Sequence, residues 1–243
     1  MKRLIQNSLV LLSLGLTATA VAPADLSPQS GWAQDRTDRD ERRVIGIDTI
    51  NIQQQMSEAY RAAAREKRRE AMGFLEDMLA NRPPKGEQKA EMMLRLADLY
   101  FEEGRDLYLS EMQAYGEEFD KCFNTEGCDS AKMIADNTES RKWQTKSIKI
   151  YRIILQNYPQ YQRADEAMFY LGSALQDTGE KDEAAKTFND LVRTYPESGY
   201  VPDAYVLIGE YYFDQNNAYK ALLAYQKAAR YKDSPKYAFA MYK

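Results

Sequence analysis

Hydrophobic side chains recur at helical spacing along most of the chain after residue 53. Residues 53–82 are rich in Ala, Arg, Glu and Lys with apolar positions every three or four residues, and the segment Arg82-Pro-Pro-Lys-Gly86 ends this pattern. The same periodicity continues over residues 87–119, past Gly104, and over residues 139–158. A period of 3.6 residues predicts amphipathic helices. The second is either a projecting helix or a helix kinked at Gly104.

The second half of the chain repeats itself. A segment of large, small and aromatic positions returns after 37 residues: Ala167, Leu171-Gly172, Leu175, Ala184 and Phe188 correspond to Ala204, Ile208-Gly209, Tyr212, Ala221 and Tyr225. An earlier copy is split, because Leu96-Ala97 matches at an offset of 75 and Tyr151 at an offset of 37. The difference between the offsets, 75 − 37, is an insertion of 38 residues. Internal repetition of this kind indicates stacked supersecondary units.

These positions resemble the tetratricopeptide repeat (TPR) family. The resemblance implies an all-α, right-handed solenoid of antiparallel helix pairs. The period of 37 exceeds the 34 of the family, the leading Trp is missing, and Asp233 stands where the family has Pro. We predict the organisation in segments: an N-terminal helix at 53–82, an interrupted first repeat at 87–159, repeats at 160–197 and 198–235, and the start of a further, truncated repeat at 236–243. A chain that stops inside a repeat is expected to be a fragment of a longer protein.

The N-terminus has the order of a secretory signal peptide. Lys2 and Arg3 precede an uncharged run at 9–22, and Ala22-Pro-Ala24 supplies small residues for cleavage, although a site after Ala33 is an alternative. The run is shorter than the roughly 20 residues that cross a bilayer. We therefore predict a signal peptide at 1–24, a disordered leader at 25–52 and a soluble, periplasmic product. No cysteine lies near the site, which argues against a lipid anchor.

Two features of the first part of the chain are open to alternatives. The β-branched patch at 44–50 suits a short strand or a docking segment. Cys122 and Cys128 close the loop Cys-Phe-Asn-Thr-Glu-Gly-Cys, and export to an oxidising compartment favours a disulfide over two free thiols. The segment has too few ligands for a metal site.

Composition excludes several classes of function. The 243 residues contain no histidine, so the usual triads and metal-ligand sets are missing. With 33 Lys and Arg against 37 Asp and Glu the formal net charge is −4, and no basic block suits nucleic acid. We expect no catalytic residues, no cofactor and no nucleic-acid partner; the partners are other proteins.

The TPR resemblance also implies a binding surface, because the first helices of such repeats line a concave face. Carried onto this chain, the face comprises Glu91, Leu94, Asp98, Phe101 and Glu102, then Glu166, Phe169, Ser173, Gln176 and Asp177, then Asp203, Val206, Glu210, Phe213 and Asp214. The set mixes acids with apolar anchors and contains no Lys or Arg, which predicts a basic and apolar partner segment. Ordinary solvation of exposed acids is the alternative interpretation.

The functional expectation is a non-catalytic, exported scaffold in a bacterial envelope complex. The stretches 97–108, 139–143 and 201–213, with the cysteine loop, resemble periplasmic TPR proteins of myxobacterial and deltaproteobacterial envelopes, some of which belong to gliding-motility machinery. One alternative is a TPR component of outer-membrane assembly or of Tol-Pal and cell-division coordination. Another is a non-catalytic repeat segment of a longer enzyme.

Overall fold

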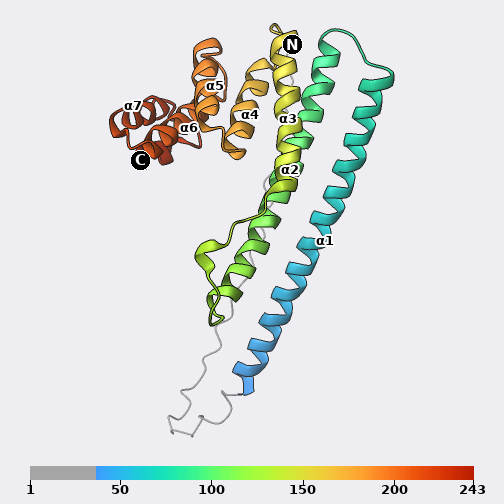
Figure 1. Ribbon diagram of the computed structural model, residues 1–243, viewed down its shortest axis with the longest axis vertical. Coiled ribbons are helices and arrows are strands. Elements are labelled where there is room, and N and C mark those ends of the chain that lie inside the picture. The colour runs from blue at the N-terminus through green and yellow to red at the C-terminus, as the bar shows by residue number, and fades with distance from the viewer. Residues whose placement is uncertain (1–36) are drawn as a thin grey trace, which may run out of the picture. The chain divides into compact units, whose positions relative to one another are not determined.

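The computed structural model describes residues 37–243, with side chains from residue 59 onward (Figure 1). The chain divides into two units, residues 1–56 and residues 57–243. The signal peptide predicted at 1–24 and the first part of the leader lie outside the described residues. Helix α1 (Thr37–Asn81) spans the boundary between the units and begins 16 residues before the predicted start at residue 53. The patch at 44–50 is therefore helical backbone.

The second unit consists of helices joined by short connections, apart from the segment between α2 and α3. They are α2 (Glu87–Phe123), α3 (Thr138–Asn157), α4 (Ala164–Asp177), α5 (Lys181–Thr194), α6 (Val201–Asp214), α7 (Ala218–Ala228) and α8 (Tyr237–Tyr242), with a single 3₁₀ turn, η1 (Ser130–Lys132). Helix α2 packs on α3, α4 on α5 and α6 on α7, and each pair packs on the next. No strand occurs within residues 37–243. The predicted all-α fold of paired helices is confirmed.

The turns inside the α4–α5 and α6–α7 pairs are built in the same way at an offset of 37 residues. Gly179 has a φ of +87°, and the Glu180 N–H donates to the Leu175 carbonyl at 2.8 Å. In the next pair Asn216 has a φ of +56°, and the Asn217 N–H donates to the Tyr212 carbonyl at 2.9 Å. This is a Schellman C-cap, which requires a left-handed residue and so selects Gly or Asn.

Close approach of the two helices in a pair depends on a glycine in the first and an aromatic ring in the second. A Cβ placed on Gly172 would lie 2.6 Å from the Phe188 ring, and one on Gly209 would lie 2.5 Å from the Tyr225 ring. Both rings are buried, at 1% and 3% exposure. The recurring Leu-Gly and aromatic positions are therefore the contact between the paired helices.

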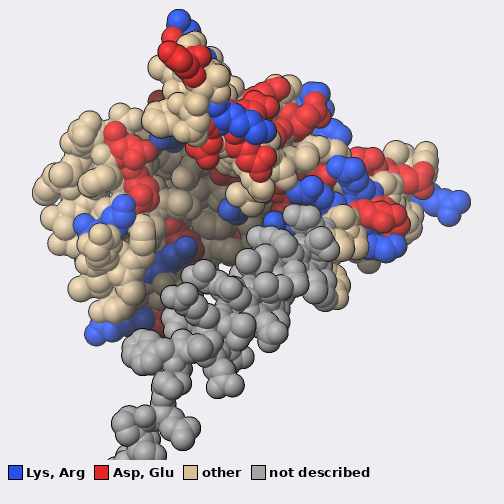
Figure 2. Space-filling model, turned by 90° about the horizontal axis from the view of Figure 1, so that it is seen from below, with Lys and Arg blue, Asp and Glu red and all other residues tan. Residues whose placement is uncertain are grey.

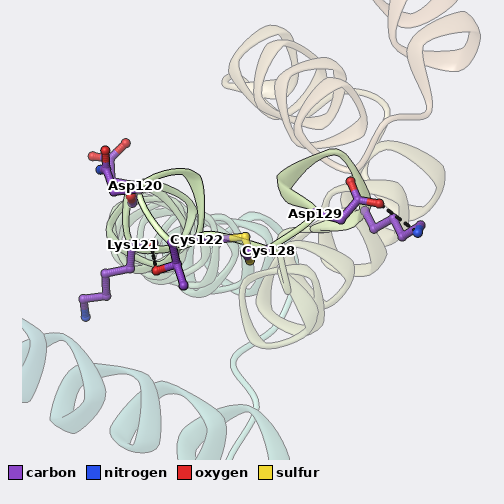
Figure 3. The surroundings of a disulfide bond; sticks show 8 residues. Asp120, Lys121, Cys122, Cys128 and Asp129 are labelled. Atoms are coloured by element: carbon purple, nitrogen blue, oxygen red, sulfur yellow. Dashed lines mark hydrogen bonds and ion pairs between the residues drawn. A yellow bond between two sulfur atoms is a disulfide. The ribbon is translucent and has the colours of Figure 1, made fainter.

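The first pair is longer than the others. Helix α2 runs without interruption through the buried Gly104, so the chain follows the projecting alternative, and beyond Gly104 it extends with the start of α3 as an arm. Cys122, in the last turn of α2, forms a disulfide with Cys128 in the following loop, with Cα atoms 5.3 Å apart. Figure 3 shows the bond pinching this loop, with Asp120 and Lys121 pointing away from it.

Within the second unit, the C-terminal part of α1 covers the outer face of α2. Met72 is 3% exposed and clusters with Leu96, Leu99 and Tyr100 of α2.

No helix of residues 37–243 combines the length and the apolar character that a membrane span needs.

The contact between α1 and α2 contains a fully buried carboxylate. The Glu103 side chain, at 0% exposure, accepts hydrogen bonds from Arg68 Nη1 at 2.9 Å and from Arg69 Nε and Nη2 at 3.0 and 2.8 Å. Charge-assisted, bidentate pairing of this kind fixes both the position and the register of α1 on α2.

Candidate functional site

A charged cavity of the second unit lies where α2 faces α4, with one residue from α1. Its volume is about 500 Å³, and its walls are Arg68, Arg95, Asp98, Phe101, Glu102, Arg105, Asp106, Leu109, Arg163, Glu166 and Tyr170. Four of these, Asp98, Phe101, Glu102 and Glu166, belong to the predicted groove. The predicted groove thus overlaps this cavity in four residues and includes none of its arginines.

Asp98 is held in place by a tyrosine from the partner helix. The Tyr151 hydroxyl, on α3, donates to Asp98 Oδ1 at 2.8 Å. Desolvation by burial is the main cause that raises the pKa of Asp98 from 3.8 to about 6, and the charge of Glu166 adds to it, while the Tyr151 hydrogen bond and Arg163 oppose it. Burial and the Asp98 charge also raise the pKa of Tyr151.

Arg163 joins α4 to α2. Its Nη1 lies 2.6 Å from Glu91 Oε1, and its Nη2 lies 2.7 Å from Glu166 Oε1. The hydrogen bonds to Glu166 are the main cause that raises the pKa of Arg163, with the charges of Glu166 and Glu91 adding to it. Two of the predicted groove acids, Glu91 and Glu166, therefore pair with an arginine of the same chain.

Two of the cavity's arginines remain available for a ligand. Arg95 makes no ion pair within residues 59–243, and Arg105 lies over the Phe101 ring, its Cζ 5.6 Å from the ring centroid, with no ion pair in the same range. Glu102 is 58% exposed and only 3.4 Å from Arg68 Nε. The walls carry four arginines and four acids, so their formal charge is balanced, in contrast to the predicted surface without Lys or Arg.

The apolar anchors are also corrected. Leu94, Phe101 and Val206 are 0%, 5% and 5% exposed, because they pack into the core between helices. Phe169 is half-buried and stacks on Tyr200 with ring centroids 4.7 Å apart. Among the predicted anchors only Phe213 is substantially exposed, at 57%.

The acids of the third copy serve contacts within the chain. Asp203 lies 3.7 Å from Lys236 Nζ, and Asp214 lies 2.8 Å from Lys181 Nζ. Glu210 accepts a hydrogen bond from the Tyr225 hydroxyl.

The remaining predicted groove residues are placed elsewhere. Ser173 bonds back to the Phe169 carbonyl at 3.1 Å, and Gln176 and Asp177 line a separate cavity. The fifteen predicted residues therefore do not form one continuous binding stripe.

The sequence holds only a weak indication that these arginines lie beside the predicted groove residues. Arg105 follows Phe101 by four residues and so shares its face, and Arg163 precedes Glu166 by three. Figure 2 shows the same intermixing, with Lys and Arg interspersed among Asp and Glu over the face in view.

Comparison with known proteins agrees with the repeat geometry. Residues 166–198 and residues 202–235 each match a family model described as tetratricopeptide repeat. These two segments are tetratricopeptide repeats. TPR repeats indicate a scaffold for protein–protein interaction, and TPR domains bind protein partners or peptides.

Two solved structures are similar to this chain. One is a thermophilic TPR protein of Thermus thermophilus, TTC0263, at 16% identity with a TM-score of 0.37, covering 76% of this chain and 95% of the other. The second is BtubC (BKLC) from P. vanneervenii, at 15% identity with a TM-score of 0.36, covering 68% of this chain and 71% of the other. A search of curated proteins finds no match.

Proposed function

We propose that the chain is a non-catalytic TPR scaffold, exported to the periplasm, whose α2–α4 cavity binds a segment of a partner protein in an envelope complex. The observation that carries the proposal is the cavity itself, because its volume of about 500 Å³ lies within the range of ligand sites and its walls combine aromatic rings with two arginines that make no ion pair within residues 59–243. Those arginines favour a partner segment with acidic and apolar side chains, in place of the basic segment that the sequence predicts.

Charge reversal in the cavity tests this function. Partners captured by the full chain from crosslinked envelopes are identified, and their binding to purified variants is measured. Arg95→Glu is expected to weaken binding by about tenfold or more, the cost of losing one charged contact. Glu118→Lys, on the exposed part of α2 outside the cavity, is the control and leaves binding unchanged. Equal binding by Arg95→Glu and the unaltered chain would refute the cavity as the partner site.

Export rests on the signal-peptide pattern at 1–24 and agrees with the disulfide between Cys122 and Cys128. Cell fractionation and N-terminal sequencing test it together. The expected product is periplasmic and begins near Asp25. A cytoplasmic product that retains Met1 contradicts export without affecting the partner cavity.

The resemblance to myxobacterial envelope proteins supports gliding-motility machinery as the complex. The identities of the crosslinked partners decide this point. Capture of motility proteins would support gliding-motility machinery as the complex. Outer-membrane assembly or Tol-Pal partners would assign the scaffold to those processes instead.

A further inference from the structure

A second cavity lies at the base of the arm, between the inserted parts of α2 and α3 and the ordinary α4–α5 repeat. Its volume is about 330 Å³, and it is bounded by α2 beyond Gly104, by the start of α3, and by the turn between α4 and α5. Three cations line it, Arg105, Arg141 and Lys181, against a single acid, Asp177. This excess of positive charge stands out on a chain with a net charge of −4.

The cavity wall also contains a buried polar atom that has no partner. Gln144 on α3 is 3% exposed, and its Oε1 atom is shielded from solvent and accepts no hydrogen bond from any described residue. Its amide lies against Gly104, where a Cβ would come within 3.1 Å of it. A buried acceptor without a donor costs stability in the free protein. A ligand with an N–H group would satisfy it if the Gln144 amide turned toward the cavity, because the atom is shielded in the free protein.

The three cations differ in the contacts that they already make within the protein. Arg141 Nη2 donates to the Thr178 carbonyl at 2.8 Å, which ties α3 to the end of α4 and holds the guanidinium at the cavity. Lys181 is 55% exposed and pairs with Asp214 at 2.8 Å, a surface contact of small energy that a ligand can replace. Arg105 has no ion pair within residues 59–243. The site therefore offers positive charge and one acceptor side by side.

We propose that this cavity is a second binding site, for an acidic residue of a peptide segment. The side-chain carboxylate faces Arg105, Arg141 and Lys181, and the backbone N–H donates to Gln144 Oε1 once the Gln144 amide has turned toward the cavity. This cavity shares Arg105 and Leu109 with the α2–α4 cavity and its other residues lie outside it, so the proposal does not depend on the function proposed above.

The test uses the full chain carrying Arg95→Glu, which disables the α2–α4 cavity, and a fluorescein-labelled, end-capped tetraglutamate peptide. Binding is followed by fluorescence anisotropy at low salt, with a tetraglutamine peptide as the uncharged probe. Tetraglutamate is expected to bind and tetraglutamine to bind at least about tenfold more weakly, since the charged contacts are lost. Absence of tetraglutamate binding would overturn the proposal.

Two variants then separate a built site from general attraction to positive charge. Gln144→Met keeps the length of the side chain but removes the acceptor, so we expect about tenfold weaker binding together with a raised Tm. Lys181→Met weakens binding to a similar degree, whereas Lys186→Met, an exposed lysine on the same helix outside the cavity, leaves it unchanged. Unchanged binding in Gln144→Met, or an equal loss in Lys186→Met and Lys181→Met, contradicts the site.

Discussion

The buried Glu103 carboxylate allows a specific prediction about how α1 is held on α2. Glu103 is 0% exposed, and three hydrogen bonds from Arg68 and Arg69 surround its carboxylate at 2.8–3.0 Å. Glu103→Gln keeps the shape but removes the charge. Breaking a buried pair costs about 3–5 kcal/mol. We expect the low end, because Arg68 retains Asp106 at 2.7 Å and Arg69 is 58% exposed and regains water.

The loss should be local to α1, which this carboxylate joins to α2. Hydrogen exchange is expected to show about 100-fold less protection over residues 59–81, the equivalent of about 3 kcal/mol, with no change in α6 and α7. Glu102→Gln is the control. The Glu102 carboxylate is 58% exposed, and its pair with Arg68 contributes at most about 1 kcal/mol. Unchanged protection of α1 in Glu103→Gln, or an equal loss in Glu102→Gln, would refute this account.

Three further predictions concern packing, pH and the disulfide. Gly172→Ala should destabilise the fold by about 1 kcal/mol, because overpacking against the buried Phe188 ring outweighs the gain in helix propensity. Gly104→Ala meets only the flexible side chain of Gln144 and should be neutral or stabilising. Thermal unfolding followed by circular dichroism compares the two variants. Because the pKa of Asp98 is raised from 3.8 to about 6, the folded protein binds this proton more tightly than the unfolded chain. Its stabilising contribution is complete below about pH 4 and is lost as the pH rises to about 6, by about 2 kcal/mol after solvent screening; urea titrations should show this decline and its absence in Asp98→Asn. Replacing Cys122 and Cys128 together by Ser should speed hydrogen exchange in the loop at 123–137 while leaving α4 to α7 unchanged, and equal exchange in the loop would contradict a closing role for the bond.

The repeats could be predicted from the sequence because each recurring residue performs a local task. Gly172 and Gly209 admit an aromatic ring of the paired helix, and Gly179 and Asn216 supply the left-handed residue of the turn. Each requirement involves only one or two neighbouring residues, so the same or similar residue types recur every 37 positions. The 37-residue period therefore carries the fold even though the match to the family is incomplete.

The binding surface could not be predicted to the same extent, because its charge is decided between helices. Arg163 neutralises Glu91 across 72 residues of sequence, and Lys181 neutralises Asp214 across 33. When the exposed face of each helix is predicted separately, the acids on it are found. The cations that neighbouring helices place beside those acids are missed. Burial of Leu94 and Val206 has the same origin, because the face of a helix that touches its neighbours depends on how the pairs stack.

The inserted segment shows how a repeat can acquire a new site. Gly104 corresponds to Gly179 at the offset of 75, yet the chain turns at Gly179 and continues as helix through Gly104. Glycine alone therefore does not end a helix; the apolar residues that follow Gly104, with Leu107 and Tyr108 at helical spacing, keep the backbone helical. Gln144 lies seven residues before Tyr151 and packs on Gly104, seven residues after Ala97, so the insertion lengthens both helices of the first pair along one shared face. The cavity at the base of the arm lies beyond Gly104, where an ordinary repeat would turn, so the lengthened parts of α2 and α3 bring side chains to it that have no counterpart in the other repeats.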